Sequence, residues 1–300
     1  MLPVSHSEGS EMDWTNWAGI LAGVLVFAAL EIDDVSLWHW NKSTKALRKR
    51  LHCAQVTRTE TLYSERELFD LPPIVQRYFR ATLKEGQPKI KTAQFSHAGT
   101  FNMSEVQPSW KFFTSNQSVV VNRPGFVWDA RVRMFPAISV FVHDAYVNRE
   151  GLLQASILGL FDVANMSGSE VMAQGEFLRF LAETPLYPTS LLPRESVVWK
   201  AIDDFSAQVT LTDRDLHVSM TFRFNPSGLI DTVWAAARGR SSGKNVEYMP
   251  WQGRFWNYAE RAGMMVPLEA EVEWLTPEGP KPYYRSKLTS ISFEFENQGQ

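Results

Sequence analysis

Three charged side chains at helical spacing are the first candidates for chemistry. Glu176, Arg179 and Glu183 stand at positions i, i+3 and i+7 of the segment SEVMAQGEFLRFLAET, residues 169–184. This spacing places them on one stripe of a helix, with the arginine between two carboxylates. Such a group can act as general acid and base or can hold the polar head of a ligand. The alternative is an ion-paired helix face with a structural role only.

The segment around these residues is predicted to be a helix. Ser167 or Ser169 can cap its first turn, and Pro185 ends it. The rest of its circumference is apolar, so we expect a helix buried on more than one side, whose polar stripe points inward or into a cavity. The apolar residues are Phe177, Leu178, Phe180 and Leu181.

Most of the chain after a second predicted helix, Pro73 to Glu85, has the two-residue period of β-strands. In one strand the row Ile138, Val140 and Val142 continues into Asp144. Turn residues recur every ten to fifteen positions, which indicates about ten antiparallel strands in series. The clearest strands are predicted at 126–134, 138–146, 205–212, 216–224, 230–236, 246–258, 264–274 and 283–295.

So many one-sided strands cannot leave their apolar faces in water. We therefore predict a mainly β fold: a large curved antiparallel sheet, as a half-barrel or open barrel, with two or three helices inside it or across its mouth. Such a sheet encloses packed side chains or an apolar ligand. The side chains predicted to contact a ligand are Trp128, Asp144, Tyr146, Glu176, Arg179, Glu183, Trp234, Trp251 and Tyr258, and the catalytic candidates are Glu176, Glu183 and Arg179.

The amino-terminal segment from Trp14 to Leu30 holds seventeen uncharged residues, the short end of a membrane-spanning helix. Tryptophans flank it on both sides, as at bilayer interfaces. A buried helix of the body and a cleavable signal peptide are the alternatives. Lysines and arginines follow the segment and none precedes it, which predicts a single-pass protein with a cytoplasmic body. Residues 42–54 can form a basic amphipathic helix on an anionic leaflet or a solvated helix face.

This pattern divides the chain into three parts. Residues 1–40 form a tail with the membrane helix, residues 41–64 a basic juxtamembrane helix or linker, and residues 65–300 a single β-rich domain.

Composition argues against several classes of protein. The net charge is −3 and the pI is about 6.1, so a nucleic-acid partner is not expected. The single cysteine, Cys53, excludes an intramolecular disulfide and a cysteine-based zinc site. Sequence motifs of α/β-hydrolases, zinc proteases and dinucleotide-binding folds are absent. We expect no metal and no cofactor.

Several stretches resemble an uncharacterised bacterial domain-of-unknown-function family. They include LPPIVQRYFRATL at 71–83, HAGTF at 97–101, PGFVWDA at 124–130, GEFLRFLAETPLYPTSLLP at 175–193 and PWQGRFWNY at 250–258. The resemblance implies an amino-terminal membrane segment and a fold similar to the lipoprotein-carrier type, in which a curved antiparallel sheet surrounds helices. It also implies binding of an apolar molecule, and it brings no catalytic residues.

The sequence is compatible with three functions. The first is a membrane-associated protein that binds an apolar or amphipathic, lipid-like small molecule in the sheet. The second is an enzyme that acts on such a molecule through the stripe of Glu176, Arg179 and Glu183. The third is a membrane-bound scaffold without a ligand.

Overall fold

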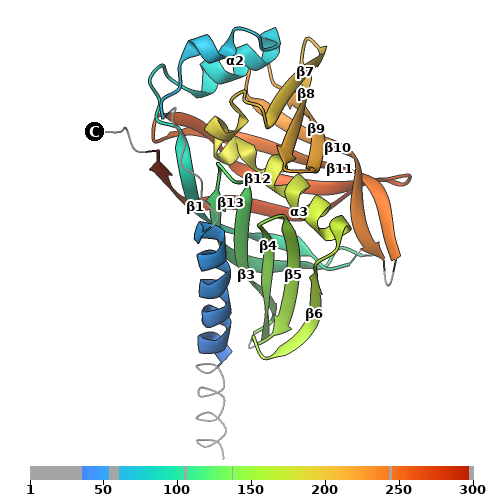
Figure 1. Ribbon diagram of the computed structural model, residues 1–300. Helices are drawn as coiled ribbons and strands as arrows, with labels where there is room; N and C mark the ends of the chain where they lie inside the picture. Colours follow the sequence, from blue (N-terminus) through green and yellow to red (C-terminus); the bar gives the residue numbers. More distant parts are fainter. Residues whose placement is uncertain (1–35, 54–60, 105–106, 137, 243–244, 297–300) are drawn as a thin grey trace, which may run out of the picture.

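The alternating segments pair into one curved antiparallel sheet (Figure 1). The structure is a computed structural model and describes residues 36–53, 61–104, 107–136, 138–242 and 245–296. Within these ranges the sheet has thirteen strands, and three α-helices accompany it. The mainly β class and the curved, unclosed sheet were predicted correctly, whereas the predicted strand number, about ten, was too low.

The strands lie in the order β6-β5-β4-β3-β2-β1-β13-β12-β11-β10-β9-β8-β7. Strands consecutive in the chain are neighbours, and the first strand pairs with the last, from Ile90 opposite Phe295 to Phe101 opposite Tyr284. The two edges, β6 and β7, are therefore the strands on either side of the helical connection. The strands are β1 (Ile90–Asn102), β2 (Trp110–Val120), β3 (Gly125–Phe135), β4 (Ile138–Val147), β5 (Glu150–Ile157), β6 (Phe161–Ser167), β7 (Val197–Asp203), β8 (Ser206–Asp213), β9 (Leu216–Phe224), β10 (Ile230–Ser242), β11 (Asn245–Arg261), β12 (Met264–Thr276) and β13 (Gly279–Phe295).

Helix α3 (Glu170–Ala182) lies across the concave face of the sheet, against strands from both halves. The Ser169 hydroxyl accepts a hydrogen bond from the Met172 amide at 3.2 Å and caps the helix, as predicted. Gly151 on β5 allows the close approach, because a Cβ there would lie 2.5 Å from the Met172 backbone. Two 3₁₀-helices, η2 (Thr184–Leu186) and η3 (Pro188–Leu191), lead from α3 toward β7.

Helix α2 (Pro73–Thr82) covers one end of the sheet beside β8 and β12, preceded by the 3₁₀-helix η1 (Glu65–Leu68). Its apolar side is buried, as the helical spacing predicted. The Gly228 turn between β9 and β10 lies against Arg77 of α2. This turn and α2 are therefore at the same end of the molecule.

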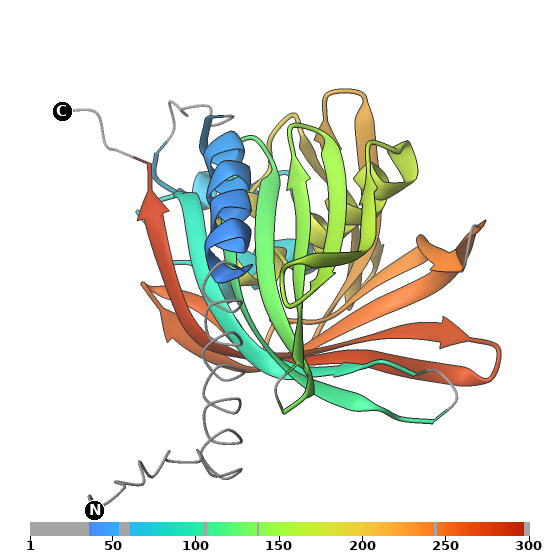
Figure 2. The ribbon, with the colours of Figure 1, turned by 90° about the horizontal axis from the view of Figure 1, so that it is seen from below.

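A third helix, residues 36–53, packs on the convex face of the sheet (Figure 2). The Trp40 indole stacks on His143 at 3.8 Å and donates a hydrogen bond to Asp129 at 2.9 Å, and Leu51 fills a small apolar cluster beside Val127. Its described residues 36–53 lie on both sides of the predicted boundary between residues 40 and 41. Its apolar face contacts the protein, so it is not free to lie face down on a leaflet.

The apolar segment at residues 14–30 lies outside the described residues. Among the helices that the structure describes, none combines the length and the hydropathy needed to span a membrane.

Candidate functional site

A cavity of about 480 Å³ lies between the concave face of the sheet and the carboxyl-terminal half of α3. Most of its lining is apolar or aromatic, and both halves of the sheet contribute to it. The lining residues are His97, Phe101, Met103, Trp128, Val132, Val140, Val142, Asp144, Leu153, Ala155, Val163, Arg179, Ala182, Glu183, Leu186, Arg238, Trp251, Phe255, Pro267, Leu268, Glu269, Ala270, Val272, Tyr283, Tyr284, Ser286 and Leu288.

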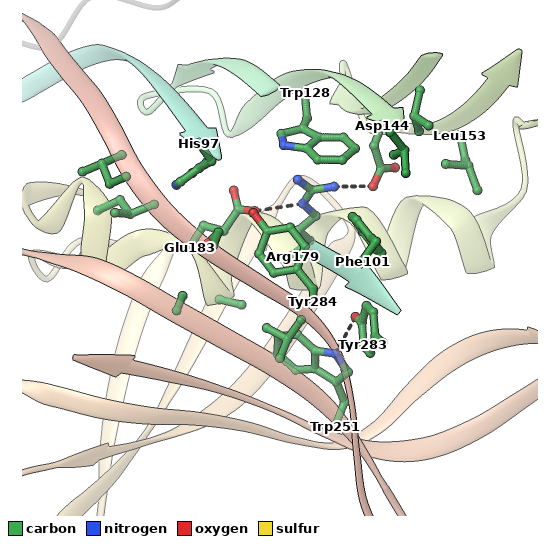
Figure 3. A pocket seen from close by; sticks show the side chains of 18 of the residues that line it. His97, Phe101, Trp128, Asp144, Leu153, Arg179, Glu183, Trp251, Tyr283 and Tyr284 are labelled. Atoms are coloured by element: carbon green, nitrogen blue, oxygen red, sulfur yellow. Dashed lines mark hydrogen bonds and ion pairs between the residues drawn. The ribbon is translucent and has the colours of Figure 1, made fainter. Parts of the chain in front are cut away.

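Arg179 is the centre of the polar part of the cavity (Figure 3). Its Nε donates to Glu183 at 2.9 Å, and its Nη1 donates to Asp144 on β4. The guanidinium also lies 4.8 Å from the Trp128 ring centroid and 4.9 Å from that of Phe126. Burial alone would lower the pKa of Arg179, but the Glu183 and Asp144 carboxylates raise it above its ordinary value. The predicted stripe therefore forms one ion pair within the helix and a second one with the sheet.

Glu176, the third member of the stripe, lies behind this network rather than in the cavity lining. Its side chain is buried, and Oε2 has no hydrogen-bond partner among the described residues. Burial raises the pKa of Glu176 well above its ordinary value, and the neighbouring Asp144 carboxylate raises it further. The Glu176 carboxyl therefore keeps its proton to a higher pH than an exposed glutamate does.

Glu176→Gln is expected to stabilise the protein above pH 5. The native state holds a proton on Glu176 that the unfolded chain releases above its ordinary pKa, so wild-type stability falls with rising pH by up to about 1.4 kcal/mol per unit. Glutamine has nearly the same shape as glutamate and does not titrate, so the variant avoids this loss of stability. Urea denaturation at pH 5 and pH 8 measures the effect, with the exposed Glu170→Gln on the same helix as control. An equal gain at both pH values would contradict the assignment.

His97, on β1, brings a neutral imidazole to the cavity wall. Burial lowers its pKa from 6.5 to about 4, against the opposing effect of the Glu183 carboxylate. Its Nδ1 and the Trp128 Nε1 are buried polar atoms without a hydrogen-bond partner in the described part of the chain. Both atoms are available to a polar group in the cavity.

Arg238 on β10 is a second cation of the cavity and was missing from the predicted set. Its guanidinium lies 4.9 Å from the Trp251 ring centroid and 6.0 Å from that of Trp274. The Trp251 indole in turn donates to the Tyr283 hydroxyl at 2.9 Å. A register shift between Ala235 and Arg238 interrupts the alternation, so the sequence pattern carries no signal that Arg238 faces inward.

Besides Glu176, three residues predicted to contact a ligand lie away from the cavity. The Tyr146 hydroxyl donates to Asp213 at 2.9 Å, and its ring stacks on Phe177. The Tyr258 hydroxyl donates to the Ile230 carbonyl at 2.5 Å. Trp234 projects from the convex face, because a bulge after Ile230 moves the inward positions of β10 to Val233 and Ala235.

The other predicted members, Trp128, Asp144, Arg179, Glu183 and Trp251, all line the cavity. His143, next to Asp144 in sequence, points to the convex face, where its Nε2 lies 2.7 Å from the Thr44 hydroxyl. In the described residues no three potential metal ligands gather at one place.

The model of the family of unknown function DUF6920 matches residues 69–293. The chain belongs to this family. The DUF6920 match begins after residues 14–30, so it does not bear on the membrane segment that the resemblance implied. No curated protein matches the chain.

Among solved structures, this DUF6920 chain is similar to a LolA superfamily protein, NE2245, from Nitrosomonas europaea. The two are 10% identical with a TM-score of 0.37, over 74% of this chain and 92% of the other. A beta-barrel-like protein of the domain of unknown function DUF1849 from Brucella abortus is also 10% identical, with a TM-score of 0.22, over 69% of this chain and 99% of the other. Both similarities are distant.

Proposed function

We propose that this protein binds an amphipathic, lipid-like molecule in the cavity between α3 and the sheet. The observation that carries the proposal is a cavity of about 480 Å³ with apolar walls and a half-buried charged network on one side. Small-molecule sites have roughly this size and this composition, with volumes of about 300 to 1,000 Å³.

The apolar body of the ligand would lie along the aliphatic and aromatic rows of the sheet. On β4 the row Val140 and Val142 leads inward to Asp144, and Phe101 and Tyr284 face it from β1 and β13 (Figure 3). Burying such a chain releases water from both surfaces, which supplies most of the affinity.

The polar end of the ligand would be held by Arg238 rather than by Arg179. The Arg179 guanidinium already pairs with two carboxylates and lies against two aromatic rings. Arg238 lines the cavity and is stacked on tryptophan, with no ion pair to a carboxylate in the described ranges. The Arg238 guanidinium beside apolar walls favours a ligand with an acidic head, a carboxylate or a phosphate, on an acyl-like chain.

A cavity-filling variant tests the proposal. Ala155 lines the cavity, so Ala155→Trp should displace the ligand and reduce co-purifying lipid at least about tenfold, while the secondary structure stays intact. The measurement is native mass spectrometry with lipid extraction on the full chain in mild detergent. Ala236→Trp places the same side chain at an exposed position of β10 and is the control.

The outcomes separate the parts of the proposal. Equal lipid on both variants would contradict binding in this cavity. Recovery of lipids without an acidic head would leave the cavity site in place and overturn the role given to Arg238. An empty wild-type protein would favour the scaffold without a ligand.

Membrane association with a cytoplasmic body is part of the same proposal. It is supported by the apolar sequence at 14–30 and by the basic residues that follow it. The single cysteine, Cys53, is exposed. A membrane-impermeant maleimide should therefore label Cys53 in inverted vesicles and not in intact cells, and the reverse result would contradict this orientation.

The enzyme hypothesis has one observation in its favour, the raised pKa of Glu176. Its position argues the other way, because Glu176 does not line the cavity and a general base must reach its substrate. Ligand binding is therefore the function that the geometry supports best.

A further inference from the structure

We propose that one corner of the sheet docks on the surface of a lipid bilayer and turns the cavity mouth toward it. This inference rests on the proposed function, since it places the binding cavity beside its source of ligand. The corner, called here the apolar corner, consists of Trp38, Phe135, Ile138, Leu160, Phe161 and Val163.

The apolar corner is formed by two neighbouring hairpin ends and by Trp38 on the adjoining helix 36–53. Phe135 pairs with Ile138 at the end of β3 and β4, and the Leu158 amide of the next hairpin donates to the Ser139 carbonyl at 2.9 Å. All six side chains of the corner are between 40% and 66% exposed. Large apolar side chains that are exposed singly are common on protein surfaces, but a group of them on neighbouring hairpin ends indicates an interaction surface.

Cations accompany the aromatic rings of this corner. The Lys42 ammonium lies 5.1 Å from the Trp38 ring centroid, and that of Lys111 lies 5.6 Å from the ring centroid of Phe135. Tryptophan and phenylalanine beside lysine suit the bilayer interface, where the rings enter the boundary and the ammonium groups meet anionic head groups. This pairing favours a lipid surface over a protein partner.

The amino-terminal sequence reaches the molecule at the same corner. Ser36, the first residue that the structure describes, lies there, because its hydroxyl donates to the Leu158 carbonyl. Only five residues separate Ser36 from Leu30, the last residue of the apolar segment, and six extended residue steps span at most about 20 Å. The chain length therefore allows the end of the apolar sequence to lie near the apolar corner.

The corner is continuous with the cavity. Ile138 stands on the same face of β4 as Val140 and Val142, which line the cavity. Val163 belongs to both, since it lines the cavity and is also exposed. A lipid chain that leaves the bilayer at the corner would follow this row inward.

A second exposed apolar group offers a matched control. Val198, Ile202 and Phe205 lie on the β7–β8 hairpin, and the Phe224 amide donates to the Phe205 carbonyl at the end of the molecule that carries α2. The β7–β8 hairpin and the β5–β6 hairpin lie at opposite ends of the structure (Figure 1). Phe205 is as exposed as the corner residues but should face away from the bilayer.

Fluorescence quenching by lipid tests the proposal. In the full chain carrying Cys53→Ser, single cysteines at Phe161→Cys, Ile138→Cys and Phe205→Cys are labelled with an environment-sensitive fluorophore. The labelled proteins are reconstituted into vesicles of phosphatidylethanolamine and phosphatidylglycerol, with or without phosphatidylcholine brominated on its acyl chain. We expect a blue shift and loss of emission at positions 161 and 138, and neither at position 205.

Two results would overturn the docking. One is the absence of quenching at positions 161 and 138, and the other is equal quenching at position 205. The lipid that the same labelled variants retain in mild detergent, before reconstitution, separates this inference from the proposed function. Retained lipid without quenching removes the docking surface alone, whereas quenching on a chain whose cavity is empty removes the ligand-binding function.

Discussion

Replacing Arg179 by methionine is expected to lower the free energy of unfolding by about 3 to 5 kcal/mol. The reason is that Asp144 and Glu183, whose side chains are only 15% and 21% exposed, lose the cation that both contact. Equilibrium urea denaturation measures the change. Arg50→Met removes an exposed ion pair with Glu150 and should cost less than about 1 kcal/mol, which makes it the control.

A second variant separates charge from packing. In the triple variant Arg179→Met, Asp144→Asn and Glu183→Gln, the carboxylates are neutral as well, and much of the lost stability should return. If the triple variant is no more stable than Arg179→Met, the effect arises from lost contacts with Trp128 and Phe126, not from uncompensated charge.

The second large effect is a loss of folding stability at low pH that depends on His97. His97 is neutral in the folded protein down to about pH 4, whereas in the unfolded chain it gains a proton below pH 6.5. The unfolded state therefore binds more protons in this window, and stability falls with decreasing pH by a total of about 3 kcal/mol. His97→Gln should remove this part of the acid sensitivity.

The measurement is the difference in unfolding free energy between wild type and His97→Gln at pH 7 and pH 4.5. Taking the difference cancels the titration of other groups, including the buried His143, whose pKa is also lowered by burial. His217→Gln makes the same substitution at an exposed position and is the control. Parallel pH profiles of wild type and His97→Gln would contradict the assignment.

The strands that could be predicted are those with one buried and one solvated face. In β9, Val218, Met220 and Phe222 are buried and alternate with exposed or half-exposed residues, so the two-residue period is visible in the sequence. Strand β6 has no buried residue, and its sequence therefore carries no such period. Weakly patterned strands of this kind explain why the predicted strand number was too low.

The site shows the same limit at the level of single residues. The Arg179–Glu183 pair follows from helical spacing alone, since its partners are four residues apart. The pairing of Arg179 with Asp144 depends on how α3 crosses β4, which no local pattern encodes. Likewise the inward direction of Arg238 depends on a bulge, and bulges reverse the face that simple alternation assigns.

The pairing of β1 with β13 has a consequence for how the chain is made. Ribosomal synthesis delivers β1 through β6 long before β13, so the outer edge of β1 has no neighbour until residues 279–295 emerge. Contacts between such distant parts of a chain form slowly, and an unpaired edge can associate with other chains. The sheet is therefore completed only after β13 has emerged, and until then the bare edge of β1 is a place where a nascent chain is exposed to mispairing.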